Sequence, residues 1–198
     1  MRNIYFDGAV LTAMAHLAAK KDIRYYLNGV LLEVNNDYIR CVATDGHIIG
    51  VYQQNNNGGD QGEPFSVIVP HDVIAKLDKK KLQHTLTKTD DNYVIDNIGF
   101  KGIDGKFPDY ERVFNLEPVS NEVAQFNPEF MDRFVKVGKA LGMKKPMPVI
   151  AHNGQKTAIV CIGKPLNFVG LMMPYRAEEP IKTVPTWLKA KEKQDAES

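Results

Sequence analysis

Histidine, cysteine and aspartate are the residues with which this chain could carry out catalysis, and their spacing forms no familiar catalytic or metal-binding motif. The five histidines fall one at a time along 198 residues, without a second ligand at metal-binding spacing. Cys41 and Cys161 lie far apart in apolar runs, so we expect buried, reduced thiols. GxSxG, P-loop and GxGxxG patterns are absent. We therefore expect neither an enzyme nor a cofactor.

Two pairs of aspartates keep a nuclease open as the weakest alternative. Asp90-Asp91 and Asp104 with Asp109 could hold Mg²⁺, as a metal-dependent nuclease does. Asp90-Asp91 precedes an asparagine between two strand patterns, however, and a turn is the simpler interpretation. We expect no metal site. Metal-dependent cleavage of DNA is the observation that would distinguish a nuclease from a non-enzymatic protein.

Basic residues recur on three predicted helices, whereas the formal net charge of the whole chain is only +1. Lysines on a helix face usually do no more than keep it solvated. Because all three helices share the bias, a common positive surface that contacts DNA phosphates without reading sequence is the functional interpretation. The residues expected to contact DNA are Lys20, Lys21, Lys76, Lys79, Lys80, Lys81, Arg133, Lys136 and Lys139.

The elements that carry these residues repeat in one order, a strand, a helix and three strands. Three β-α-β-β-β units are predicted near 1–54, 63–103 and 121–174. The predicted fold class is α+β, with helices on one face of antiparallel sheets. The predicted helices are 8–20, 71–82 and 128–142. The predicted strands are 2–6, 24–34, 38–45, 47–54, 65–70, 83–90, 92–97, 98–103, 123–127, 148–153, 156–162 and 167–174.

Composition indicates a globular protein with a sizeable core. Hydrophobic residues make up 43% of the chain and charged residues 25%. The N-terminus lacks the pattern of a signal peptide, and no apolar run approaches the roughly 18 residues of a membrane span. We therefore expect a cytoplasmic protein without a membrane partner. Residues 55–63 have the composition of a flexible connection.

Several motifs resemble the bacterial DNA polymerase III beta subunit, the sliding clamp. RYYLNGVLLEV, IRCVATDGHIIGVY and DGKFPDYERVF (104–114) resemble the family's middle domain. QFNPEFMDRFVKVGKAL and FVGLMMPYR resemble the second half of its last domain. The resemblance implies a DNA-clamp-like fold with a complete domain over 1–117 and a half domain over 118–176. We expect Asp104, Phe107, Pro108 and Tyr110 to be structural, as a turn that locks the connection between domains. The composition of residues 177–198, with its prolines and alternating charges, favours a flexible tail. In the tail, we expect Trp187 and Leu188 to dock on the protein.

The resemblance also implies a surface pocket that captures short peptides of polymerases and repair proteins. Taken singly, the aliphatic members of this set are better interpreted as strand core; taken together, they join the first unit to the far end of the chain and favour a groove. Ile48 stands where the family usually has arginine, and Asn115 stands where a proline usually follows. The matching positions are Leu27, Thr44, Gly46, His47, Ile49, Leu171, Met173, Pro174, Tyr175 and Arg176.

The resulting hypothesis is a shortened, non-enzymatic replication factor of the sliding-clamp type. Its expected partners are double-stranded DNA, a DNA polymerase or other clamp-binding proteins, and further copies of itself. Since the family's ring has twelve such units, the same circle would need four of these chains. A protein of another class stays open as the main alternative: an adaptor or decoy that captures clamp-binding peptides without encircling DNA.

Overall fold

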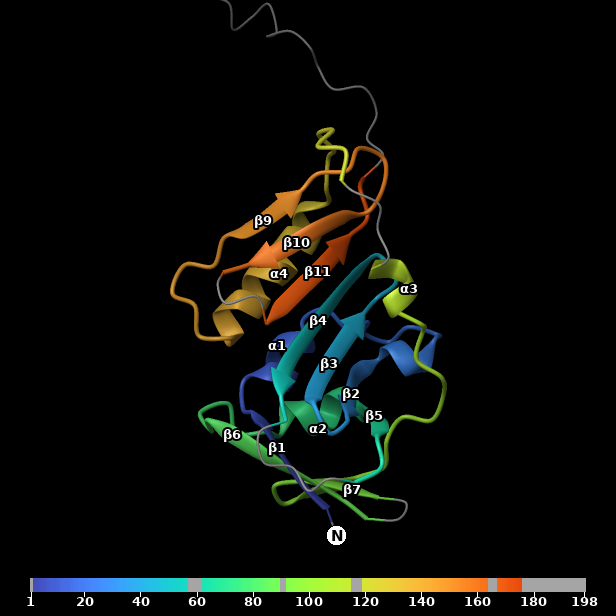
Figure 1. Cartoon of the computed structure of the whole chain (residues 1–198), viewed down its shortest axis with the longest axis vertical. Coiled ribbons are helices and arrows are strands. Elements are labelled where there is room, and N and C mark those ends of the chain that lie inside the picture. Colours follow the sequence, from blue (N-terminus) through green and yellow to red (C-terminus); the bar gives the residue numbers. More distant parts are fainter. Residues whose placement is uncertain (1, 57–61, 90–91, 115–118, 164–166, 176–198) are drawn as a thin grey trace, which may run out of the picture.

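The computed structural model describes residues 2–56, 62–89, 92–114, 119–163 and 167–175 (Figure 1). Its first unit contains β1 (Arg2–Asp7), α1 (Val10–Met14), the short 3-10 helix η1 (Tyr25–Leu27), β2 (Gly29–Val34), β3 (Tyr38–Thr44) and β4 (Ile48–Asn55). The turn before β3 forms because the Asn35 side chain accepts hydrogen bonds from the backbone N–H groups of Asp37 and Tyr38. These strands confirm the predicted order of elements in this unit.

The second and third units follow the same plan with shorter or missing parts. The second contains β5 (Phe65–Pro70), α2 (His71–Ala75), β6 (Gln83–Lys88), β7 (Tyr93–Ile95), β8 (Ile98–Phe100) and the short helix α3 (Glu111–Phe114), which was not predicted. The third contains α4 (Pro128–Ala140), β9 (Pro148–Ala151), β10 (Ala158–Ile162) and β11 (Phe168–Met172). Helix α4 begins as the sequence predicts, with the Asn127 side chain accepting from the Glu129 N–H and Pro128 in the first turn.

All the strand pairs are antiparallel and fall into two sheets. A four-stranded sheet has the order β1-β6-β7-β8, and a seven-stranded sheet has the order β5-β2-β3-β4-β11-β10-β9. The third unit thus joins the first through β4 and β11, where Gly50 lies opposite Gly170. Added Cβ atoms there would lie 2.3 Å from the Leu17 side chain and 2.5 Å from the Phe134 ring, so only glycine allows this close approach.

Helices α1, α2 and α4 lie on the same side of the seven-stranded sheet (Figure 1). Apolar residues of these helices and of the inward face of the strands form the main core. A second cluster, centred on Leu31, Val42 and Leu171, lies on the opposite face beneath the segment 101–114. This arrangement confirms the predicted α+β fold class, with helices on one face of antiparallel sheets. No helix in the described ranges has the length and apolarity needed to cross a bilayer.

Four predicted elements were wrong in extent or type. Helices 8–20 and 71–82 are single short turns of α-helix, since the chain after each bends into i→i−3 hydrogen-bonded turns such as Leu17 N–H to Met14 O. Residues 24–28 form a 3-10 turn instead of the start of a strand. Residues 123–127 form no strand, because no neighbouring sheet in the described chain offers them a ladder partner.

Candidate functional site

A groove of about 260 Å³ opens where the first and third units meet, at the ends of β4 and β11. Seven of the ten residues predicted for the peptide pocket line it together. They come from two stretches of the sequence, 27–49 and 171–173, which lie more than a hundred residues apart. The seven residues are Leu27, Thr44, Gly46, His47, Ile49, Leu171 and Met173. Its floor is aliphatic and buried, whereas Met173 is 45% exposed at its rim. The chemistry of this surface suits apolar side chains of a bound segment.

The tight turn between β3 and β4 shapes one side of the groove. The Thr44 hydroxyl donates to the Ile48 carbonyl and accepts from the Gly46 N–H. Asp45 accepts from the N–H groups of His47 and Ile48, which closes the turn from the other side. Gly46 has φ +95°, a left-handed conformation that costs glycine little. A sequence with Thr-Asp-Gly at this point therefore holds the His47 ring at the rim.

The end of β11 completes this side. The Met173 N–H donates to the His47 carbonyl at 3.0 Å, so the residue after β11 is attached to the turn. The His47 ring in turn stacks on Phe130 of α4, with ring centroids 5.8 Å apart. The groove is consequently supported from both units at once.

The segment 101–114 forms the opposite wall and adds residues that were not in the predicted set. Tyr110 donates its hydroxyl to Glu33 and accepts from Arg40 at 2.7 Å, so the segment is latched across the outer face of the sheet. Burial, and then the hydrogen bond to the Glu33 carboxylate, raise the pKa of Tyr110. The latch matches the expected structural role of the DGKFPDY motif. The added lining residues are Arg24, Tyr26, Ile48, Pro108, Tyr110, Val113 and Thr157.

Two predicted pocket residues do not line the groove, and a third lies outside the part of the chain that the structure describes. Pro174 and Tyr175 lie just beyond it, where the Tyr175 N–H donates to the Gln125 carbonyl at 2.7 Å. Arg176 lies outside the described residues, as do the tail 177–198 and Asn115. The departure at Ile48 is also visible, because this side chain is buried in the core instead of being a polar contact at the surface.

The predicted basic surface is present on the helical side of the molecule. Lys79, Lys136 and Lys139 gather around His16 in a hollow of about 320 Å³. Burial lowers the pKa of His16, and the neighbouring lysines lower it further, as expected where positive charges converge. Lys20 and Lys21 line an adjoining hollow beside Lys136. Three of the predicted lysines make local ion pairs: Lys76 with Asp72, Lys81 with Asp96, and Lys136 with Asp132.

Arg133 was predicted on this surface and points elsewhere. Its guanidinium donates to the carbonyl oxygens of His16, Leu17 and Ala18 and forms an ion pair with Asp45. The side chain is half-buried, and its donors are directed at α1 and the β3–β4 turn. These contacts favour a structural role for Arg133 over the predicted DNA contact, which stays a prediction. They join residues more than a hundred positions apart, which helical periodicity could not indicate.

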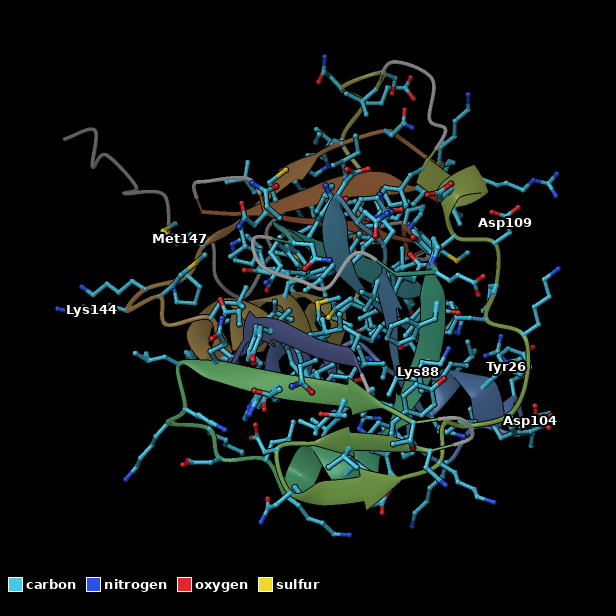
Figure 2. The ribbon with its side chains drawn as sticks, turned by 60° about the horizontal axis from the view of Figure 1, so that its bottom comes forward. Tyr26, Lys88, Asp104, Asp109, Lys144 and Met147 are labelled. Carbon is cyan, nitrogen blue, oxygen red and sulfur yellow. The ribbon has the colours of Figure 1, made fainter. Side chains whose placement is uncertain are left out.

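Metal and nucleophile chemistry gain no support from the described residues. No cluster of three His, Cys, Asp or Glu side chains that could hold a metal occurs among them. Asp104 and Asp109 lie apart along the outer segment (Figure 2). Asp90 and Asp91 lie outside the described residues. Cys41 is buried, and burial raises the pKa of its thiol, which disfavours the reactive thiolate.

Sequence comparison finds one family. The profile described as DNA polymerase III beta subunit, central domain, matches residues 9–109. The beta sliding clamp of Pseudomonas aeruginosa is 39% identical over 106 residues, and that of Escherichia coli K12 is 34% identical over 114 residues. These matches cover 48% and 54% of this chain. The chain spans only 28% and 30% of the two relatives it matches.

Structure comparison extends the likeness over most of the chain. A crystal structure of the DNA polymerase sliding clamp from Pseudomonas aeruginosa aligns with a TM-score of 0.67 at 21% identity, covering 89% of this chain and 67% of that one. A putative DNA polymerase III beta subunit from Eubacterium rectale aligns with a TM-score of 0.68 at 12% identity, covering 88% and 66%. At these identities the structural likeness concerns the fold.

Proposed function

The chain belongs to the DNA polymerase III beta-subunit family, and from that premise we propose that it acts as a sliding-clamp-like processivity factor of DNA replication. In this role it is non-catalytic and works in the cytoplasm, holding a polymerase or repair protein close to duplex DNA. Two surfaces divide the work. The groove at the β4–β11 junction binds the partner protein, and the basic helical face contacts phosphates.

The observation that carries the proposal is the composition of the groove. Its lining is aliphatic at the floor, through Leu27, Ile49 and Leu171, and a flexible methionine stands at the rim. Such a surface can receive two or three bulky side chains of a short peptide, and methionine adapts to their shapes. A peptide bound there contacts the first and third units together, because the lining comes from both.

The basic helical face supports the second half of the proposal. Lys79 and Lys139 belong to different units, yet both line the hollow around His16. Neither has an ion-pair partner within 4.0 Å among the described residues. Lysines without protein partners exchange their counterions for phosphates and read no base edges, as required of a surface that moves along DNA.

Titration with a labelled peptide tests the proposal. The peptide carries a glutamine followed by bulky aliphatic and aromatic anchors, and the expected Kd is on the order of micromolar. Met173→Glu should abolish binding, because a bound peptide would bury the new carboxylate without a partner. Met147→Glu is the matched control: this exposed methionine lies outside the groove. Equal peptide binding by the Met173 variant and wild type would contradict the groove assignment.

The adaptor alternative keeps the groove and dispenses with DNA. It is favoured by one observation: the residues that line the groove all belong to this chain, so forming the groove requires no duplex DNA. An adaptor binds the same peptide but not duplex DNA. Measuring both affinities at low salt separates the two functions, since the clamp-like factor binds both ligands.

A further inference from the structure

The first and second units are joined by an exchange of their first strands. Strand β1 leaves its own unit to pair along six residues with β6, and β5 pairs along six residues with β2. Each unit therefore donates its first strand to the other unit. In return, each accepts the other's first strand at the edge of its three remaining strands, β2-β3-β4 or β6-β7-β8. This reciprocal exchange shows how two such units combine in this chain.

The third unit has both a segment that could be donated and a strand edge that could accept one, but neither has a partner strand within the described ranges. Its segment 121–127 precedes α4 as β5 precedes α2, but it belongs to neither sheet. Its strand β9, which corresponds to the acceptors β2 and β6, is the terminal strand of the seven-stranded sheet. Within the described ranges, no strand pairs with its outer edge.

One hydrogen bond places the unpaired segment where a donor strand should lie. In the second unit, the Ile103 N–H donates to the Ile68 carbonyl, joining the third residue after β8 to the third residue before α2. In the third unit, the Tyr175 N–H donates to the Gln125 carbonyl. This bond likewise joins the third residue after the last strand, β11, to the third residue before the helix, α4. The segment is thus already positioned like β5, and only the accepting strand is missing.

Large apolar side chains are exposed on both the donor and the acceptor. Val123 of the segment is 85% exposed, Val149 of β9 is 67% exposed, and Met147 just before β9 is 78% exposed. Figure 2 shows Met147 and Lys144 on the outer loop of this unit, projecting away from the rest of the molecule. Single exposed apolar residues are common, but here they flank one open strand edge.

We propose that two copies of this chain associate through their third units, each inserting its segment 121–127 antiparallel beside β9 of the other. The occupant is a second copy because donor and acceptor lie on the same unit, which makes the surface self-complementary about a two-fold axis. Between two chains, this would be the same kind of strand exchange that β1 and β5 make within one chain.

The expected contact is weaker than the exchange within the chain. Strand β9 has four residues, against six in β2, and Pro148 has no N–H to donate. The donor segment is also held by its own chain: the Asn121 N–H donates to the His152 carbonyl, the Gly154 N–H donates to the Glu122 carbonyl, and the Ala124 N–H donates to the His152 imidazole at 3.2 Å. The Ala124 contact must be released on insertion, and the two backbone bonds hold the start of the segment at residues 152–154 of its own chain. We therefore expect a dimer that forms at micromolar concentrations and dissociates on dilution.

Sedimentation velocity over a range of concentrations, without DNA or peptide, tests the proposal. The expected particle has twice the 22.2 kDa mass of one chain. Val149→Lys should raise the dissociation constant at least tenfold, because an edge lysine opposes strand addition. Gly99→Lys is the matched control: it puts the same charge on β8, a terminal strand of the four-stranded sheet, where an added Cβ meets nothing within 4 Å.

Backbone hydrogen exchange locates the contact without a mutation. Amides in 121–127 and 148–151 should become protected as concentration rises, while those in 98–100 should not change. A single-chain mass at every concentration would overturn the proposal, and so would a dimer whose protection falls on 98–100. The proposed function is unaffected by either result, since neither measurement involves DNA or a partner peptide.

Discussion

Arg133 on α4 forms an ion pair with Asp45 in the turn between β3 and β4, which ties the third unit to the turn that shapes the groove. The same guanidinium donates to three carbonyl oxygens at the end of α1. It therefore satisfies carbonyl groups of the turn that follows the short helix and compensates a half-buried carboxylate. These contacts make Arg133 a structural residue between the two proposed binding surfaces.

We predict that Arg133→Ala lowers the free energy of unfolding by about 2 to 3 kcal/mol, because it strands the Asp45 carboxylate and three carbonyls. Urea denaturation measures this loss. Arg133→Lys should lose less, since it keeps the charge but not the planar set of donors. An alanine variant of unchanged stability that binds DNA more weakly would contradict the structural role and place Arg133 on the DNA surface.

The lysines of the helical face should behave in the opposite way. Replacing Lys79 and Lys139 by glutamate should weaken binding to duplex DNA of any sequence and reduce the salt slope of log K by about 0.9 for each phosphate that the variant no longer neutralises. Stability should change little, because both side chains are exposed. The control is the same charge change at Lys101 and Lys106 on the outer segment. Equal loss of DNA binding in both variants would show that only net charge matters.

Part of the stability in acid should depend on Asp96. Burial alone would raise the pKa of this carboxyl, but hydrogen bonds from Lys81, the Thr85 N–H and His84 outweigh it and lower the pKa to about 2. A carboxyl whose pKa is lower in the folded state stabilises above its unfolded value of 3.8, and this contribution disappears as pH falls towards 2.

Asp96→Asn should therefore flatten the fall in stability between pH 4 and pH 2. Asparagine also tolerates the left-handed backbone of this position, where φ is +56°, so the turn itself should survive. Thermal denaturation at a series of pH values measures the difference. An unchanged pH profile in the variant would show that the ion pairs of Asp96 do not contribute.

The parts of the fold that could be predicted are those that local sequence determines. Strand β5 matches its predicted bounds, and the turn at Asp45-Gly46 forms where the predicted strands 38–45 and 47–54 meet. The parts that could not be predicted depend on distant partners. Helix α1 ends early beside Arg133, 117 residues away from His16, and residues 123–127 alternate like a strand but lack a ladder.

In the candidate groove, too, the features set by local sequence could be predicted and those set by distant contacts could not. The aliphatic floor and the Thr-Asp-Gly turn could be located from the motifs, although their peptide-binding role stays a prediction. Pro108 and Tyr110 were interpreted as structural, and their place in the groove wall was missed. That place depends on the Tyr110 latch to Glu33 and Arg40, which joins residues about 70 positions apart. Nothing in local spacing indicates such a contact.

Methyl NMR of the methionines tests the central claim most directly, that the groove is the peptide site. With the methionine methyl groups labelled and Met173 assigned by Met173→Leu, the partner peptide is added to the intact protein. We predict that the Met173 resonance shifts in proportion to peptide bound, while the resonance of Met147, on the outer loop, stays in place. Peptide binding that leaves Met173 unmoved, or shifts Met147 instead, would contradict the account.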